Sequence, residues 1–361
     1  LTSIAVDNVT INVAAHGLTV GNRVIFETSA SGSLGGVVLN SIAYVVTNVT
    51  SGSFQIASNG TVVTLGALTA PVTVRPGLVW ATGDAVDKTF IVPITDDFVK
   101  NAKKSDVQAA LAALFMDTET FYGPYNPIVV NTGAHLALID TGNGEAAYNS
   151  TKGLNGQLMA NLPAAGIDAA AIDTVIISHF HGDHINGLLK ADNTLAFPNA
   201  KIYVPAPEYR YWMSDDEMKH ASSPRIEFLF KNVRRVMSGE VLKRVQQYEW
   251  DTEIIPGITA VATPGQSPGH TSHIITSGNS KVFVHADVTH APYLFVRNPG
   301  WHPFYDHYPE KSEETRRKVL EMLASTRMLV QGYHFPFPGV AHIEKTATGY
   351  REVPIQWDPL L

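Results

Sequence analysis

The chain has 361 residues, of which 45% are hydrophobic and 16% are charged, so it can bury a sizeable core and is not intrinsically disordered. Asp and Glu outnumber Lys and Arg by 33 to 26, and this acidic balance argues against a nucleic-acid partner, because phosphate binding needs basic surface. No apolar run approaches the roughly 20 residues that span a bilayer. The absence of cysteine excludes disulfides, thiolate nucleophiles and cysteine-ligated metals.

The N-terminal segment differs in composition from the rest of the chain. Residues 1–74 contain only three of the charged residues, whereas the other 56 lie beyond them. Short runs rich in β-branched residues alternate here with turn sequences such as Asn59-Gly60, a pattern that predicts a small antiparallel sheet or barrel. The predicted strands are 9–13, 23–28, 43–47, 54–57 and 62–65. We therefore expect two domains, a β-rich module over 1–75 and a larger domain over 76–361.

Two functions are open for this N-terminal module. It has almost no charge and joins the rest of the chain near Pro71–Pro76 without a long polar linker. We therefore expect it to pack on the larger domain, at the rim of the active site or at a homodimer contact. The runs His16–Gly21, Ala43–Val46 and Phe54–Ile56 also resemble small β-modules of phage-tail and surface proteins. This resemblance implies the alternative of a surface or phage-associated binding protein.

Beyond the module, predicted strands and helices alternate, which is typical of a layered α/β domain. Ser105-Asp106-Val107-Gln108 matches a capping box and predicts the start of a helix, while Pro163 predicts the end of another. The predicted helices are 105–116, 153–162, 225–248 with breaks, and 312–324. The predicted strands are 128–131, 136–139, 174–178, 201–204, 258–262, 281–284, 328–331 and 349–357.

The histidines gather in the second half of the chain. Of 14 histidines, all but His16 and His135 lie at or beyond residue 179, and the densest cluster is His179-Phe180-His181-Gly182-Asp183-His184, directly after strand 174–178. Burying four such groups without a partner is costly, whereas imidazole and carboxylate suit zinc and related divalent metals. His179 and His181 can face one cation while Asp183 and His184 face another. The spacing therefore predicts a two-metal site.

Three further candidate ligands each follow a predicted strand. His270 lies in the loop Thr263–Thr271, which glycine and proline punctuate, Asp287 follows strand 281–284, and His334 follows strand 328–331. Each of these residues by itself fits an ordinary loop or turn as well as it fits a metal site. Together with the cluster they make seven groups. Seven suffice for three histidines on one metal, an aspartate and two histidines on the other, and one bridging carboxylate.

The order of these motifs resembles the metallo-β-lactamase superfamily, and Asp140-Thr141-Gly142 matches the early strand-end motif of that superfamily. The resemblance covers roughly residues 78–357. It implies an α/β fold, an αββα sandwich with a dimetal site at the sheet edges, to which this chain adds the small all-β N-terminal segment. It also implies two divalent ions per chain, zinc in the first place, with Mn, Fe or Co suited to the same ligands. The implied ligands are His179, His181 and His270 for the first metal, Asp183, His184 and His334 for the second, and Asp287 as the bridge.

Several short stretches of the sequence resemble the methyl parathion hydrolase and dihydrocoumarin hydrolase group. The stretches that carry this resemblance are Phe98–Asn101, Tyr125–Pro127, Gly332–Pro338 and Glu344–Thr346. It implies a periplasmic or secreted hydrolase that attacks lactones, aryl esters or organophosphate triesters with a hydroxide shared by two metals. The N-terminal segment departs from this group. A β-lactam hydrolase on the same fold is an alternative, although that branch usually lacks the bridging aspartate found here as Asp287.

The remaining expectations concern residues that act around the metals. Asp183 or Asp287 is expected to pass a proton to the leaving group. Asp140, Thr271 and His273 are candidates to orient the metal-binding imidazoles.

Aromatic residues near the ligand loops suggest a pocket for small hydrophobic ester, lactone or phosphotriester substrates. Among them, Trp212 and Phe335 are the residues expected to line this pocket. For the whole chain we expect a homodimer, no nucleic-acid partner and no membrane span.

Overall fold

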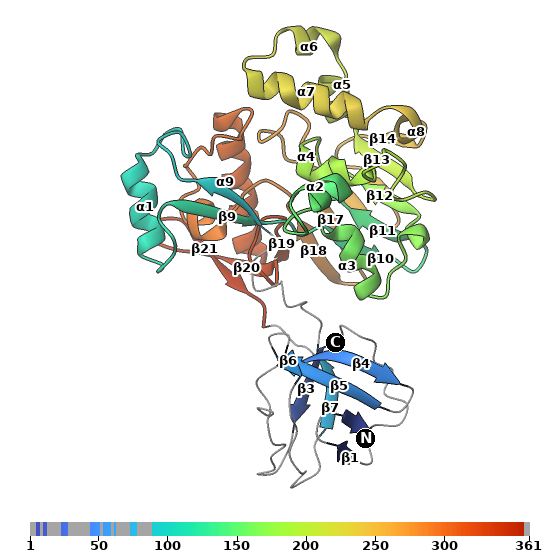
Figure 1. Ribbon diagram of the computed structural model, residues 1–361. Helices are drawn as coiled ribbons and strands as arrows, with labels where there is room; N and C mark the ends of the chain where they lie inside the picture. The colour runs from blue at the N-terminus through green and yellow to red at the C-terminus, as the bar shows by residue number, and fades with distance from the viewer. Residues whose placement is uncertain are drawn as a thin grey trace. The chain divides into compact units, whose positions relative to one another are not determined.

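The computed structural model describes residues 92–356 throughout and, before them, eight strand segments (Figure 1). The chain divides into two compact units, which are Leu1–Val86 with Asp358–Leu361, and Asp87–Trp357. Among the described residues, no helix is both long enough and apolar enough to cross a bilayer.

The first unit contains a seven-stranded sheet in the order β1-β2-β5-β4-β3-β7, with β6 paired to β5. Its strands are β1 (Ala5–Asp7), β2 (Thr10–Asn12), β3 (Arg23–Glu27), β4 (Tyr44–Thr50), β5 (Ser53–Ser58), β6 (Thr61–Val62) and β7 (Thr73–Gly77). Every pairing among these strands is antiparallel. Strand β7 occupies most of the segment Pro71–Pro76, and the domain boundary at residue 75 stays a prediction.

We expect limited proteolysis with chymotrypsin to leave the join near residue 75 intact, because a packed join denies the protease the local opening that it needs. The measurement is a time course of fragments identified by mass. The same digestion in urea is the control, since it shows whether the sequence near the join is cleavable at all. Rapid native cleavage that releases a larger fragment with full activity would contradict the expected packing of the module.

The second unit contains two larger sheets and one two-stranded sheet. The five-stranded sheet has the order β10-β11-β12-β13-β14, the seven-stranded sheet runs from β15 to β21 in sequence order, and β8 pairs with β9. The strands are β8 (Thr89–Pro93), β9 (Thr120–Pro124), β10 (Ile128–Asn131), β11 (Leu136–Ile139), β12 (Thr174–Ile176), β13 (Lys201–Pro205), β14 (Val245–Tyr248), β15 (Glu253–Ile255), β16 (Ile258–Ala262), β17 (Thr271–Ser277), β18 (Ser280–Val284), β19 (Leu329–Gln331), β20 (Val340–Lys345) and β21 (Tyr350–Pro354).

The helices of this unit connect the strands and cover the sheets. They are α1 (Lys104–Ala112), α2 (Gly144–Ser150), α3 (Leu158–Ala164), α4 (Gly182–Ile185), α5 (Ala206–Trp212), α6 (Asp215–Lys219), α7 (Pro224–Val236), α8 (Gly239–Leu242) and α9 (Pro309–Thr326). Strands β11 to β14 run parallel, as do β18 and β19, while the other pairs in the two sheets are antiparallel.

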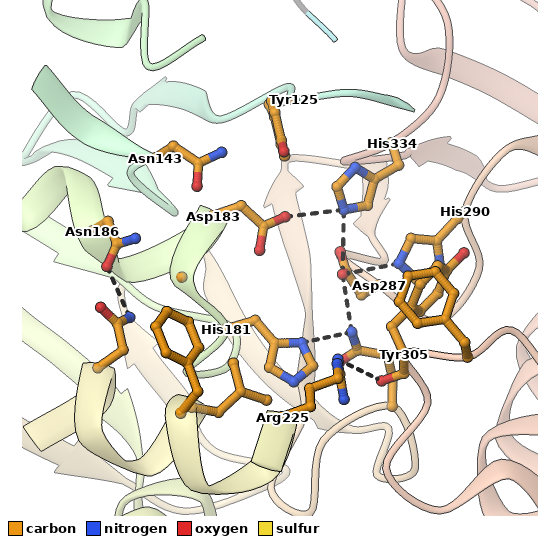
Figure 2. A pocket seen from close by; sticks show the side chains of 16 residues that line it. Tyr125, Asn143, His181, Asp183, Asn186, Arg225, Asp287, His290, Tyr305 and His334 are labelled. Carbon is orange, nitrogen blue, oxygen red and sulfur yellow. Dashed lines mark hydrogen bonds and ion pairs between the residues drawn. The ribbon is translucent and has the colours of Figure 1, made fainter. Parts of the chain in front are cut away.

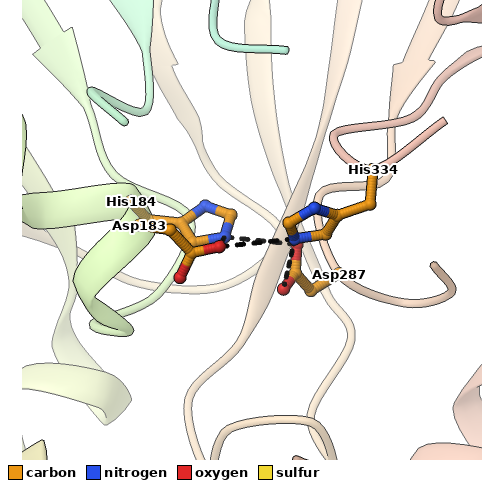
Figure 3. Close-up of side chains that lie close together, drawn as sticks. All are labelled: Asp183, His184, Asp287 and His334. Atoms are coloured by element: carbon orange, nitrogen blue, oxygen red, sulfur yellow. Dashed lines mark hydrogen bonds and ion pairs between the residues drawn. The ribbon is translucent and has the colours of Figure 1, made fainter. Parts of the chain in front are cut away.

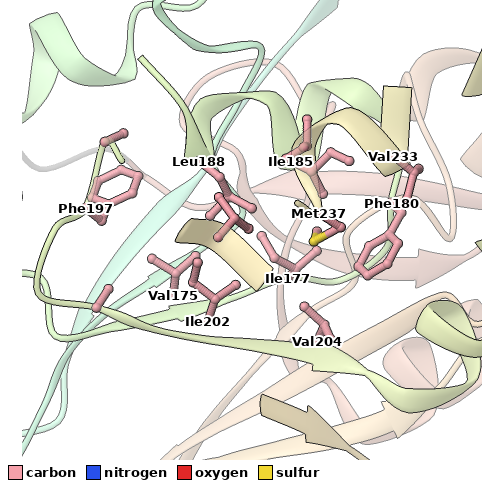
Figure 4. Packing of buried hydrophobic residues seen from close by; sticks show 14 of the residues in the cluster. Val175, Ile177, Phe180, Ile185, Leu188, Phe197, Ile202, Val204, Val233 and Met237 are labelled. Carbon is pink, nitrogen blue, oxygen red and sulfur yellow. The ribbon is translucent and has the colours of Figure 1, made fainter. Parts of the chain in front are cut away.

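The first outer layer packs helices on the five-stranded sheet. Val175 and Ile202 of the sheet share one buried cluster with Phe230 and Val233 of α7 (Figure 4). Helix α7 is amphipathic, with buried apolar residues three and four positions apart, so one face enters this cluster and the other stays charged. Burial of this apolar stripe holds the helix against the sheet.

Two more clusters complete a four-layer sandwich. Between the sheets lies a cluster to which both contribute, including Ile139, Ile176, Ile258 and Val284. On the far side of the seven-stranded sheet lies a cluster shared with α9, including Phe283, Val330, Val319 and Leu323. The layer order is therefore helices, sheet, sheet and helix, which confirms the expected αββα arrangement.

Two predicted helices differ from the structure in detail. Helix α1 begins close to the expected position, but Lys103 is its N-cap residue and no side chain caps it, so the capping-box interpretation of Ser105 was wrong. The helix also ends early, and Phe115 beyond it adopts a left-handed φ of 59°. Helix α3 contains Pro163 in its last turn instead of stopping before it, and α2 was not predicted.

The segment 225–248 was predicted as a broken helix throughout, but its last part is strand β14. Val245 pairs with Ile202 and Tyr248 with Pro205 in parallel register. The short sequence Val245–Tyr248, with apolar residues at its two ends, fits either structure locally. Its backbone N–H and C=O groups are bonded by the neighbouring strand, so tertiary pairing decides the outcome.

Candidate metal centre

The seven predicted ligands come together where strands of the two sheets end. His179 and His181 follow β12, Asp287 follows β18 and His334 follows β19. His270 immediately precedes β17, and the first turn of α4 carries Asp183 and His184. The carboxyl ends of neighbouring parallel strands meet at one edge of a sheet, which is why residues so distant in sequence converge.

Two groups of side chains have donor atoms close enough to hold a cation. In one group the ligand atoms of Asp183, His184, Asp287 and His334 lie within 4.8 Å of one another (Figure 3). In the other group, the atoms of His179, His181 and Asp287 do so. Asp287 belongs to both groups, as a bridging carboxylate must.

Three of the candidate ligand imidazoles are held in orientation by hydrogen-bond partners of their Nδ1 atoms. Nδ1 of His184 lies 2.8 Å from Asp140, Nδ1 of His179 lies 3.0 Å from the Ser178 hydroxyl, and Nδ1 of His334 lies 2.8 Å from the Pro124 carbonyl oxygen. Such contacts select the tautomer and the ring direction of a metal ligand.

The Nε2 atoms of the histidines, which face the interior of the centre, show whether a cation fits there. The Nε2 atoms of His179, His181 and His184 are buried and make no hydrogen bond within the described residues, although those of His179 and His184 lie 3.7 and 3.2 Å from Asp287. Buried nitrogens without a hydrogen bond are costly in a folded protein, whereas a divalent cation would use them as ligands. The donor set of imidazoles and carboxylates therefore fits a divalent metal.

Two of the candidate ligands, His181 and His270, each have a ring nitrogen in contact with another group of the protein. Nε2 of His270 accepts a hydrogen bond of 3.0 Å from the Asp287 backbone N–H, although the His270 ring lies 4.9 Å from the His179 ring. Nδ1 of His181 lies 2.8 Å from the Gln266 amide nitrogen, which also lies 3.2 Å from Asp287. The structure thus brings all seven residues together, and their roles as metal ligands stay predictions.

Burial and neighbouring charges shift the pKa values of the centre in opposite directions. Burial opposes ionisation of Asp287, but the imidazoles of His334 and His184 hold the pKa of this carboxyl well below its usual value. Burial likewise disfavours a charged His334, yet Asp287 and Asp183 more than offset this and raise its pKa to about 9. Burial lowers the pKa of His179 well below its usual value. Cation binding must therefore displace protons from part of the centre.

The three predicted orienting residues have different outcomes. Asp140 contacts His184 and also accepts hydrogen bonds of 2.8 Å from the Ser178 backbone N–H and hydroxyl. The Thr271 hydroxyl instead donates to the Gly269 carbonyl oxygen. His273 lies 3.1 Å from the Tyr248 hydroxyl, next to the layer between the sheets. The interpretation of Thr271 and His273 as orienting residues was therefore wrong, because both side chains form their hydrogen bonds with groups other than the candidate ligand imidazoles.

A pocket of about 410 Å³ lies over the centre (Figure 2). Asp183, Asp287 and His334 line it together with the apolar side chains of Phe228 and Phe304. The partly exposed Asp183 carboxylate faces this space, with 22% of its side chain accessible.

Trp212 and Phe335, the predicted pocket residues, do not line this pocket. Trp212 is fully buried, packs against Phe230 and donates a hydrogen bond of 2.7 Å from Nε1 to Glu208. Phe335 is fully buried in the cluster under α9. This prediction was wrong because sequence proximity to a ligand does not fix which way a large side chain points.

The sequence matches the profile of the metallo-beta-lactamase superfamily over residues 121–332, more than half of the chain. The chain belongs to this superfamily. Similar proteins include the N-acyl homoserine lactonase AiiA of Bacillus thuringiensis subsp. kurstaki, 25% identical over 216 residues that cover 56% of this chain and 74% of AiiA. The N-acyl homoserine lactonase AttM of Agrobacterium fabrum is 29% identical over 120 residues, which cover 33% of this chain and 42% of AttM.

Solved structures are similar to this chain over three quarters of its length. AidC, a dizinc quorum-quenching lactonase in complex with a product, has a TM-score of 0.67 at 25% identity, covering 75% of this chain and 93% of AidC. The hydrolase AbOPH of the beta-lactamase superfamily has a TM-score of 0.68 at 24% identity with the same coverage, which supports the fold alone. The narrower resemblance to the methyl parathion hydrolase group stays a prediction.

Glu208 of α5 connects two ligand loops of this superfamily site, and the sequence reading missed it. Its fully buried carboxylate accepts hydrogen bonds from the Phe180 N–H at 2.9 Å and the Gly269 N–H at 2.6 Å. It also accepts from the indole of Trp212 and the hydroxyl of Ser267. Phe180 separates His179 from His181, and Gly269 precedes His270. One carboxylate therefore binds the backbone of both ligand loops and fixes the distance between them.

Gly269 explains how the loop reaches this carboxylate. A Cβ atom at this position would lie 2.1 Å from the Glu208 backbone nitrogen, so only glycine allows the approach. The Gly-His pair that marks the loop in sequence thus also reports a packing requirement. A buried Glu in a short helix carries no such signal by itself.

Replacing Glu208 with glutamine is expected to weaken metal retention by about tenfold to a hundredfold and to lower the free energy of unfolding by about 1–3 kcal/mol. All four groups around the carboxylate are donors, so the amide NH₂ of glutamine would face another donor. Competition with a chromophoric chelator and denaturation by urea measure the two effects. The exposed Glu217→Gln on α6 is the control, and equal metal retention in both variants would contradict the role of Glu208.

His290 and Arg225 are two further pocket residues that sequence reasoning missed. Nε2 of His290 lies 3.1 Å from Asp287, and its ring stacks on His334 at 4.7 Å. His290 follows Asp287 by three residues in a histidine-rich stretch, so a signal for it was present. Arg225, at the start of α7, reaches the pocket from another part of the chain, and no local motif marks it.

Proposed function

We propose that this protein is a dinuclear zinc hydrolase that opens lactones. The observation that carries the proposal is the pair of His/Asp groups that share Asp287 beneath the pocket. Lactones are the proposed substrates because AiiA, AttM and AidC are all named lactonases. N-acyl homoserine lactones are the first substrates to test, since two of these names specify them.

Two bound divalent cations would supply an activated water and polarise the carbonyl oxygen of the lactone. The residues of the chain then have separate tasks. Asp287 holds the two halves of the centre together, and the Nδ1 contacts of the imidazoles keep the ligand geometry. Asp183 is placed to accept a proton from water and return it to the leaving oxygen, because its carboxylate faces the pocket. The apolar side chains of Phe228 and Phe304 would contact the acyl chain.

The experiment is a substrate panel on protein that has been loaded with zinc and analysed for metal. The panel contains N-hexanoyl homoserine lactone, dihydrocoumarin, methyl parathion and nitrocefin, and the product is identified by mass. We expect ring opening of the homoserine lactone at the highest kcat/KM. Turnover of nitrocefin or methyl parathion in the absence of lactone turnover would replace this proposal with a β-lactam or phosphotriester hydrolase.

A further inference from the structure

The metal pocket contains a guanidinium with no carboxylate partner. Arg225 is half-buried in the pocket wall, and Figure 2 shows its side chain reaching toward the space near His181 and Tyr305. Its hydrogen bond of 3.3 Å goes from Nη2 to the Tyr305 backbone carbonyl oxygen. Within residues 92–356, no Asp or Glu side chain lies within ion-pair distance of Arg225.

The carboxylates that act on Arg225 from farther away have other partners. Asp306 forms an ion pair of 2.9 Å with Arg316. Asp183 faces the imidazoles of His184 and His334 in the metal centre. Arg225 thus keeps its positive charge without a local counter-ion, and guanidinium groups in such positions bind planar anions well.

Arg225 also lies at a border between two cavities. A second cavity of about 560 Å³ adjoins the metal pocket, and Arg225 and Phe304 line both. A lactone whose ring occupies the metal pocket would therefore place its acyl group near Arg225, which lines the same pocket. The pocket wall is partly apolar, because Phe228 and Leu229 of α7 line it together with Arg225. Phe228 is 66% exposed and available to contact such a group.

We propose that Arg225 forms an anion subsite at the border of the metal pocket, and that the lactones preferred by this protein carry a carboxylate on their acyl part. The inference rests on the proposed lactonase function and narrows its substrate class. The carboxylate would receive charge-assisted hydrogen bonds from the guanidinium, while the methylene groups lie along Phe228 and Phe304. Arg225 here determines specificity and takes no part in bond cleavage.

Matched substrates test the subsite. N-succinyl, N-glutaryl and N-adipoyl homoserine lactones are compared with the N-butanoyl, N-pentanoyl and N-hexanoyl lactones of the same chain lengths. We expect at least one carboxylated lactone to exceed its neutral partner in kcat/KM by about tenfold to a hundredfold, the range of a charge-assisted hydrogen bond. Arg225→Met should lower kcat/KM much more for the carboxylated lactones than for their neutral partners and so abolish this preference, and Arg225→Lys should retain part of it.

Lys231→Met is the matched control, because this exposed residue lies on the same helix and loses the same charge. A second readout avoids turnover. The γ-lactam analogues of the best matched pair are titrated into the zinc-loaded protein by calorimetry, and the carboxylated lactam should bind more tightly only when Arg225 is present.

The outcomes separate this inference from the proposed function. Lactone turnover with no preference for a carboxylate in any pair, or an equal loss for both members in Arg225→Met, would overturn the subsite and leave the lactonase function standing. Arg225-dependent binding of the carboxylated lactam without lactone turnover would support the subsite and refute the lactonase function.

Discussion

Asp287→Ala is expected to lower kcat/KM by about a hundredfold to a thousandfold while the protein stays folded. The carboxylate lies 3.2 Å from Nε2 of His184 and 3.3 Å from Nε2 of His334, and it belongs to both groups of candidate ligands. Its removal would leave these two imidazoles without their shared counter-charge, and it would take the carboxylate out of the group with His179 and His181. The hydrophobic clusters do not contain it, so the sandwich does not depend on it.

Steady-state kinetics, metal analysis and urea denaturation of the same preparation measure this prediction. Asp287→Asn keeps the side-chain volume and removes the charge, so it separates loss of ligand charge from loss of packing. Asp216→Asn is the control for a surface carboxylate, since Asp216 is exposed on α6. Unchanged turnover in Asp287→Ala would mean that this residue only shapes the turn after β18.

Removal of metal by a chelator is the second change with a large expected effect. We expect about two ions to leave each chain and activity to fall to background, because a two-metal hydrolase has no other source of activated water. We also expect each ion to contribute about 3 kcal/mol of stability when free metal is near 100 times its Kd. Metal analysis and thermal unfolding, before and after dialysis, measure the two effects.

Reloading the metal is also expected to release protons, and this release can be measured. Asp287 and Asp183 raise the pKa of His334 to about 9 against the effect of burial, so this imidazole is protonated at neutral pH in the metal-free protein. Reloading zinc should therefore release protons at pH 7, and this release should diminish as the pH rises past 9. Calorimetry in buffers of different ionisation enthalpy measures it. Metal near zero after zinc-replete purification would end the interpretation as a metal-dependent hydrolase, and Asp287→Ala is the control with weakened binding.

The largest part of the site could be predicted from local sequence. The run His179–His184 places four potential ligands next to a buried strand, and neither composition nor core packing explains such a run. Strands β10, β11 and β16 match their predicted bounds, because apolar and β-branched runs end at clear turn residues. Membership of the superfamily followed from motif order alone.

Only the tertiary structure decided which groups support and border the centre. Glu208 and Arg225 reach it from α5 and α7, and the side chains that they approach belong to distant loops. Trp212 and Phe335 were assigned to the pocket from their positions in sequence, yet both point into packed layers. Candidate metal ligands can be recognised from residue type and spacing, which a sequence displays. The positions of supporting carboxylates and of charged residues in the pocket wall depend on how strands and helices are placed. This placement is set by burial of apolar surface over the whole sandwich.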